Sequence, residues 1–274
     1  MTAPAHSSLL VVADAYLDSA PRPDADVVET GAFSLFVSRT PWSYYARPAR
    51  THPEPVTVAD IDVLAAACDE HQVRLEIEWV HQIHPELVEV TASFGLTVNS
   101  YALMTLDAEE PLLAPATDSV VRVVDADDPA LLQGWAVAGI SFSAGGTAIG
   151  SWGTAEREIG ARDLPLEMVA HLRDRARRRL SVTAVAETGD GVVASGLYNP
   201  VGDVAEVLAV ATLPAARRQG FAGAVTAGLV EHARANGVRL LLLSAESDDV
   251  ARVYGRLGFR RIGTTCAAER PPPD

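Results

Sequence analysis

The basic loop Arg217-Arg218-Gln219-Gly220 lies between a short apolar segment and an amphipathic one. Glu206 to Leu213 is rich in Val and Leu and stops at Pro214, which predicts a buried strand. Phe221 to Arg234 spaces its apolar residues like a helix that packs by one face. The first amides of such a helix lack partners and carry the positive end of its dipole, so the loop can bind an anion such as pyrophosphate.

The residues after this helix add a second pattern. Val238 to Ser244 predicts another apolar strand, and the helix that follows carries Tyr254 in Y-x-R-L-G-F, which ends at Phe259. Together with the spacing Arg217-x-x-Gly220-x-Ala222, this order of elements resembles the GNAT-type N-acetyltransferases, which take an acyl group from acetyl-CoA. The resemblance covers about Val120 to Thr265.

The resemblance implies how the coenzyme would be held. In that family the loop binds the CoA pyrophosphate, and the strand before it splays to admit the pantetheine. Ser247 stands where many relatives carry Asn, and its hydroxyl can still bond to CoA. Acetyl-CoA is expected as cosubstrate and no metal is expected. The expected cofactor-binding residues are Ala209, Val210, Ala211, Arg217, Arg218, Gln219, Gly220, Phe221, Ala222 and Ser247.

Two residues are expected to be catalytic, each with an alternative. Glu206 in A-E-V-L-A-V-A resembles the glutamate that accepts the amine proton in some members, and half-burial would raise its pKa toward that of a base. The alternative is a strand-end acid that faces solvent. By the same resemblance Tyr254 protonates the departing thiolate; the alternative is a core aromatic. Amides along Ala209 to Ala211, freed by a bulge, would polarise the thioester carbonyl.

The expected fold is α/β (α+β), a tandem GNAT-like fold with a mixed, mostly antiparallel sheet flanked by helices. In the first half, a helix, a strand, a helix that ends in Phe-Gly and a strand repeat the order seen from Phe221 to Cys266, which predicts a second GNAT-like unit. These segments are Val58 to Cys68, Val73 to Val80, His84 to Phe94 and Thr97 to Leu106. Arg47-Pro48-Ala49-Arg50 has a proline where backbone donors would be needed, so this unit is degenerate. The expected domains are residues 1–115, degenerate, and 119–268, catalytic, with a linker from Pro111 to Asp118.

Other segments predict the remaining elements. The first half also has an apolar run from Ser8 to Ala15, a breaker-rich stretch from Ser19 to Asp26, and strands at Gly31 to Val37 and Trp42 to Ala46. The second half has a strand at Val120 to Val124, an acid-capped helix from Pro129 to about Ser141, a helix at Leu164 to Leu180, and a hairpin of Ser181 to Glu187 with Val192 to Tyr198. A loose glycine-rich segment, Ser143 to Gly153, is expected beside the acceptor.

Charge is distributed unevenly along the 274 residues, whose net charge is -14. Residues 1–118 hold 5 Arg and 18 acids, whereas residues 119–274 hold 17 Arg and 18 acids, so the second half is the better host for polyanionic CoA. The acidic first half could concentrate a cationic amine, or it could serve solubility alone. No nucleic acid is expected at this charge, and no apolar run is long enough to cross a membrane.

The cysteines and histidines carry no clear chemistry. Cys68, His71, His81 and His84 fall on different expected elements, which argues against a zinc site, and two cysteines make no disulfide framework, so a cytoplasmic protein is expected. The expected function is acetyl transfer from acetyl-CoA to a primary amine by direct attack in a ternary complex. A small-molecule acceptor is favoured over a protein, and a homodimer is left open. The alternative is a non-catalytic acyl-CoA-binding or interaction protein with the same fold.

Overall fold

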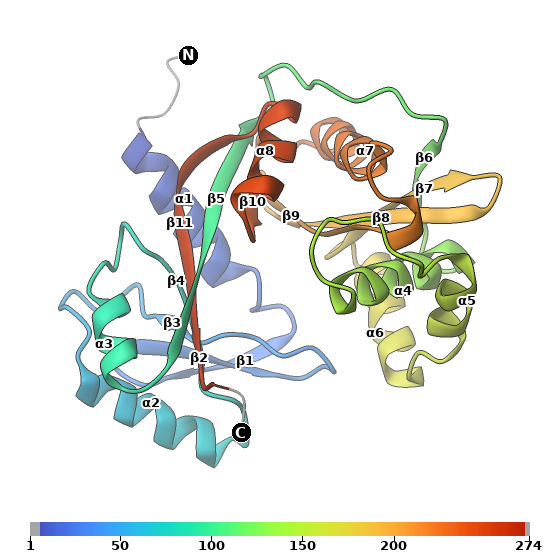
Figure 1. Cartoon of the computed structure of the whole chain (residues 1–274). Helices are drawn as coiled ribbons and strands as arrows, with labels where there is room; N and C mark the ends of the chain where they lie inside the picture. The colour runs from blue at the N-terminus through green and yellow to red at the C-terminus, as the bar shows by residue number, and fades with distance from the viewer. Residues whose placement is uncertain (1–5, 272–274) are drawn as a thin grey trace. The chain divides into compact units, whose positions relative to one another are not determined.

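The computed structural model describes residues 6–271, which fall into two compact units (Figure 1). Unit 1 contains the residues up to Met104, Ser244–Ala251 and the residues from Arg261 onward. Unit 2 contains Thr105–Leu243 and Arg252–Arg260. The C-terminal residues that the sequence analysis assigns to one domain are therefore divided between the units. Four elements have residues in both: β5 (Thr97–Asp107), β10 (Leu240–Ala245), α8 (Asp248–Leu257) and β11 (Arg260–Glu269).

Unit 1 begins with a helix and a small antiparallel sheet. Helix α1 (His6–Ser19) is followed by β1 (Ala25–Glu29), β2 (Phe33–Ser38) and β3 (Arg47–Pro48), which pair in that order. Then come α2 (Val58–Glu70), β4 (Glu76–Val80) and α3 (Leu87–Ser93). Strand β4 pairs antiparallel with β11, from Val80 opposite Thr265 to Glu76 opposite Glu269. The last strand of the chain thus completes the unit that the first residues begin.

The apolar core of unit 1 explains why α2 forms where it does. Ile61, Leu64 and Cys68 of α2 are all buried, at the spacing of one helix face. They pack with Ile77 and Trp79, which alternate along β4 and are fully buried. The helix and strand periodicities that the sequence shows are therefore those of the core.

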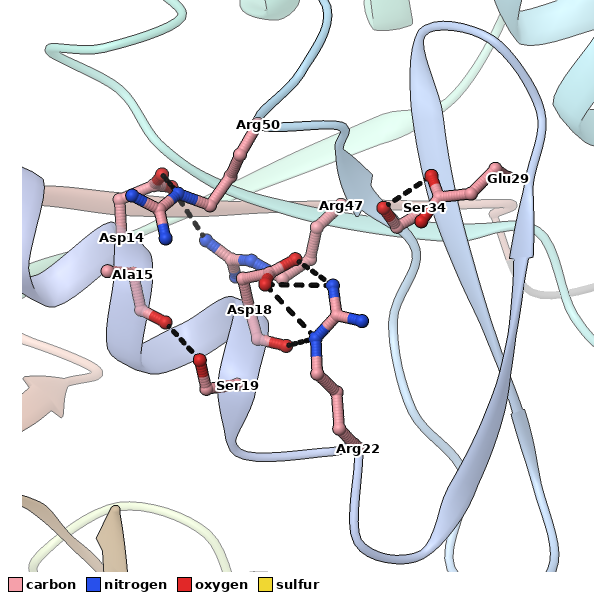
Figure 2. A network of polar contacts seen from close by, with 9 residues as sticks. All are labelled: Asp14, Ala15, Asp18, Ser19, Arg22, Glu29, Ser34, Arg47 and Arg50. Atoms are coloured by element: carbon pink, nitrogen blue, oxygen red, sulfur yellow. Dashed lines mark hydrogen bonds and ion pairs between the residues drawn. The ribbon is translucent and has the colours of Figure 1, made fainter. Parts of the chain in front are cut away.

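A buried arginine connects three elements of unit 1. The side chain of Arg47 on β3 is only 2% exposed. Its Nη1 donates to Glu78 Oε2 on β4 at 2.7 Å, and its Nη2 donates to Asp14 Oδ1 on α1 at 3.2 Å. Figure 2 shows Arg47 beside Asp14, and Asp18 of the same helix paired with Arg22. Since an unpaired buried charge is costly, these carboxylates hold α1 and β4 to β3.

Unit 2 contains a mixed, mostly antiparallel sheet, as predicted. Strands β6 (Val120–Val124), β7 (Val182–Thr188), β8 (Gly191–Val201) and β9 (Val204–Thr212) pair antiparallel, and β10 pairs with β9 in parallel. Helix α7 (Phe221–Ala235) covers one face of these strands, and three helices cover the other (Figure 1). These are α4 (Pro129–Ser143), α5 (Thr154–Arg162) and α6 (Leu166–Arg177).

The predicted acid cap of α4 is present. Asp128 Oδ1 accepts a hydrogen bond from the amide of Ala130 at 2.9 Å, with Pro129 in the first turn. Arg122 on β6 donates to both Asp128 and Glu187. The hydrogen bond from Arg122 lowers the pKa of Asp128, which keeps the cap ionised.

One predicted strand of the first half is wrong. The apolar run from Ser8 to Ala15, for which no element is predicted, lies in helix α1, and the breaker-rich stretch from Ser19 to Asp26 leads into β1. The segment from Trp42 to Ala46 is not a strand, and its last residue, Ala46, forms an isolated β-bridge with Ile77. Its aromatic residues favour a strand only where a neighbouring strand packs against them, and Trp42 is 45% exposed.

Helix α5 was not predicted, and the helix predicted at Leu164 to Leu180 is the shorter α6. Only Arg157 of α5 is buried, so the sequence shows no apolar face there. Arg157 holds the helix in place by donating to the carbonyl of Asp190 at 3.2 Å. Of the helices within residues 6–271, none combines the length and the apolar character needed to span a bilayer.

Candidate functional site

Glu206 lies where two parallel strands stop pairing. The pairing of β9 with β10 runs from Val204 opposite Leu240 to Glu206 opposite Leu242. Both strands continue beyond this point, β9 to Thr212 and β10 to Ala245. Glu206 is therefore the last residue of β9 in the shared ladder, and it is partly buried. From Val207 on, the residues of β9 no longer take part in this ladder.

A bulge interrupts β9 on its other side, as expected. Ser195 of β8 faces Ala211, and Leu197 faces Leu208, so Ala209 and Val210 both lie opposite Gly196. Ala209 has φ +52, a left-handed conformation that a residue with a Cβ adopts only at a cost of about 1 to 3 kcal/mol. A Cβ on Gly196 would lie 2.9 Å from Val210 Cγ2, so only glycine leaves room for the bulge. The bulge therefore turns the backbone of Ala209 and Val210 out of the regular ladder.

The loop after β9 ends in a helix N-terminus with free donors. A short 3-10 turn, Pro214–Ala216, leads to Arg217, and Gly220 precedes α7 with φ +84. The first bond of α7 runs from the amide of Ala224 to the carbonyl of Gly220 at 3.0 Å. Within residues 6–271, no group accepts a hydrogen bond from the amides of residues 218–223. These donors and the positive end of the helix dipole are suited to a pyrophosphate.

The arginines of the loop differ in what they contact. Arg217 donates to the carbonyls of Ser141, Gly145 and Ala148, at 2.9, 3.0 and 2.9 Å. Its guanidinium therefore fixes the end of α4 and the glycine-rich segment to the loop. Arg218 has φ +66 and is exposed, and its side chain has no partner among the described residues. Of the two, Arg218 has the cation that is available to a ligand.

Tyr254 and Ser247 lie on or before α8. Tyr254 is partly buried, and its ring meets that of Phe259 edge to face with centroids 5.9 Å apart. The ring is thus held by packing while part of the side chain stays accessible. Ser247 Oγ accepts a hydrogen bond from the amide of Val250 at 3.3 Å, so it caps the first turn of α8.

Residues 149–259 match the model of the Acetyltransferase (GNAT) family. This part of the chain is a GNAT domain. It contains the strand with Glu206 and the bulge, the loop with the free amides, and Tyr254. No curated protein matches the sequence.

Solved GNAT structures are similar to nearly the whole chain. A GCN5-related N-acetyltransferase from Kribbella flavida has a TM-score of 0.72 at 18% identity, over 97% of this chain and 96% of its own. A tandem GNAT protein from the clavulanic acid biosynthesis pathway has a TM-score of 0.57 at 14% identity, over 89% of this chain and 80% of its own. A GCN5-related N-acetyltransferase-like protein from Streptococcus suis has a TM-score of 0.54 at 14% identity, over 97% and 99%. The chain therefore has a tandem GNAT fold.

The glycine-rich segment from Ser143 to Gly153 lies beside the loop that follows β9, and its glycines alone predict no fixed position for it. The amide of Gly150 donates to the carbonyl of Pro214, and the amide of Ala215 donates to the carbonyl of Trp152, both at 3.0 Å. These bonds and those of Arg217 hold the glycine-rich segment against the loop that follows β9. Its exposed large apolar side chains are Ile149 and Trp152, and Phe142, in the last turn of α4, is exposed as well. The glycine content predicts an irregular segment. The residues that anchor it lie about 70 positions away in the sequence, so no local pattern predicts the anchoring.

The described residues hold no group of His, Cys, Asp and Glu that could bind a metal ion. Cys68 and Cys266 are both buried and unpaired, and burial raises the pKa of each thiol.

Proposed function

We propose that the chain is an acetyl-CoA-dependent N-acetyltransferase that acetylates a primary amine. The observation that carries the proposal is the run of unpaired amides at residues 218–223, which directly follows a strand that leaves its ladder at Glu206. The amides and Arg218 would bind the pyrophosphate, with Gln219, Gly220, Phe221 and Ala222. Arg217 would act by fixing the loop. The pantetheine would lie along β9 beyond Glu206, and Ser247 would add a hydroxyl contact.

The transfer would occur by direct attack in a ternary complex. Glu206 would take the proton of the ammonium acceptor, directly or through water, and so create the nucleophile. The amine nitrogen would form a bond to the acetyl carbon, and the carbon–sulfur bond would break. The backbone of Ala209 and Val210, which the bulge turns out of the ladder, would stabilise the oxyanion together with that of the neighbouring Ala211. Tyr254 would protonate the leaving thiolate of CoA.

The acceptor is proposed to be a small-molecule amine rather than a protein, and neither a nucleic acid nor a membrane is proposed as a partner. The net charge of -14 would favour a cationic acceptor over an anionic one. We also propose a cytoplasmic location, because both cysteines are unpaired thiols.

The first test is calorimetric titration with acetyl-CoA, followed by release of free thiol from acetyl-CoA in a panel of primary amines. Glu206→Gln and Tyr254→Phe should each lower kcat by about 10² to 10⁴, with little change in the affinity for acetyl-CoA. Glu231→Gln, an exposed glutamate on α7, is the matched control and should keep full turnover. Binding without thiol release on any amine would support a non-catalytic acyl-CoA-binding protein instead, and no binding would refute the coenzyme site.

A further inference from the structure

A hollow lies in unit 2, at the opposite end of α7 from the loop proposed to bind the coenzyme. It has a volume of about 540 Å³, within the usual range of about 300 to 1,000 Å³ for small-molecule sites. Its walls come from the ends of β6, α6, β8 and α7 and from the start of β7. Because α7 has 15 residues, its two ends are about 20 Å apart. A ligand in this hollow would not touch the pyrophosphate loop.

The floor of the hollow carries a paired phenol and imidazole. Tyr198 is 2% exposed, and its hydroxyl lies 2.9 Å from Nδ1 of His232. Their rings lie 6.0 Å apart, tilted by 43°. The side-chain amide of Asn236 donates to the carbonyl of His232 at the end of α7. The pair supplies fixed polar groups in an otherwise partly apolar wall, which is the composition of a binding site.

Arg179 contributes a cation with no partner. It has φ +55 directly after α6, where glycine is the preferred residue. Holding a larger residue in this conformation costs stability and is found most often at functional sites. Within residues 6–271 its side chain makes no hydrogen bond or ion pair. Arg179 and Tyr198 line the same hollow, where burial raises the pKa of Tyr198 and the charge of Arg179 opposes that rise.

Asp125 contributes the opposite charge. It follows β6, is exposed, and its carboxylate has no hydrogen bond or ion pair in the described part of the chain. The other two charges of the wall, Arg177 and Asp127, neutralise each other at 2.7 Å. Among the described residues that line the hollow, the free cation is therefore Arg179 and the free anion is Asp125. The carbonyl ends of α6 and α7 add partial negative charge that favours an ammonium group.

We propose that this hollow binds a small zwitterion with the charges of a free α-amino acid. The carboxylate of the ligand pairs with Arg179 and the ammonium group pairs with Asp125. The hydroxyl of Tyr198 and the imidazole of His232, which also line the hollow, add polar groups beside these two charges. This site is separate from acetyl transfer, and the proposal does not depend on the coenzyme site.

The test uses the full chain and a panel of probes: the common α-amino acids, their N-acetyl derivatives, which lack the ammonium group, and their amides, which lack the carboxylate. Isothermal titration should find at least one α-amino acid that binds, and should find binding weaker by about tenfold or more for both derivatives, because each loses a charged hydrogen bond. No binding by any amino acid at millimolar concentration would overturn the proposal, as would equal binding of either derivative.

Arg179→Gly is the decisive variant, since glycine suits the left-handed backbone and deletes only the cation. It should weaken amino-acid binding by about tenfold or more, and Asp125→Asn should do the same. Gln72→Gly is the matched control, because Gln72 in unit 1 has the same φ of +55. That variant should bind as the wild type does. Unchanged binding in Arg179→Gly would refute the site, whereas its titration with acetyl-CoA, expected to be unchanged, reports on the coenzyme loop separately.

Discussion

The N-termini of α2 and α7 stand at the same place in the two repeated units, yet they are completed differently. In α2, Asp60 accepts hydrogen bonds from both the amide and the hydroxyl of Thr57, at 2.8 and 2.6 Å. The helix thus carries its own anion. In α7 the first turn has no acidic residue, and Gly220 has no side chain with which to cap it. The first turn of α7 therefore lacks the carboxylate that Asp60 supplies in α2.

The arginines of the two units differ in the same way. Arg47 is buried and forms ion pairs with Asp14 and Glu78, so it is part of the framework of unit 1. Arg217 donates to neutral carbonyls and so holds a loop next to the free amides without neutralising any anion. In unit 1 the arginine is paired with acids of its own unit, whereas in unit 2 the loop next to the arginine keeps its amides unpaired within the described residues.

The largest effect should come from the framework arginine. Arg47→Met removes the partner of two partly buried carboxylates and should lower the free energy of unfolding by about 3 to 5 kcal/mol. Arg217→Met, the matched change in unit 2, should cost only about 1 to 2 kcal/mol, because it leaves carbonyls that water can satisfy. Urea denaturation measures both. Equal losses would mean that the two arginines serve the same structural purpose.

A carboxylate placed in the first turn of α7 should prevent an anion from binding at this helix N-terminus, because it supplies the negative charge that Asp60 supplies in α2. Ala222→Asp puts a negative charge about 5 Å from a bound pyrophosphate, which at an effective dielectric constant near 20 weakens acetyl-CoA by roughly 100-fold. Ala222→Asn has the same shape without the charge and should lose far less. Calorimetry on the pair separates charge from size. Similar affinities for the two variants would argue that no anion binds at this helix end.

The smallest effect concerns Asp60 itself. Its hydrogen bond from the hydroxyl of Thr57 lowers its pKa in the folded protein, so its stabilising effect is present above the unfolded pKa of about 3.9 and is lost as the pH falls through the folded pKa. Asp60→Ala should therefore cost about 0.5 to 1 kcal/mol at pH 7 and progressively less below about pH 4. Thermal melts of both proteins across this range measure the difference. A difference that stayed constant with pH would show that the charge of Asp60 is irrelevant.

The sequence predicts best the elements in which local pattern and packing agree. Strand β6 lies where it was expected and ends in the buried Val124, and α7 starts where it was expected, at the buried Phe221 after Gly220. Helix α5 was missed because its one buried side chain, Arg157, is polar. The bulge followed from the resemblance to GNAT proteins. The role of Arg217 as a loop anchor could not be predicted, since its carbonyl partners are distant in sequence.

The pairing of β4 with β11 has a consequence for how the chain is made. Val80 and Thr265 are partners in that ladder, so about 185 residues must be synthesised between them. At about 5 to 20 residues per second, β4 waits roughly 10 to 40 s on the ribosome before its partner exists. Its unpaired edge is exposed to other nascent chains throughout that time. The first unit to be translated is therefore the last to be completed, and a ribosome that stops before β11 releases a chain with an open strand.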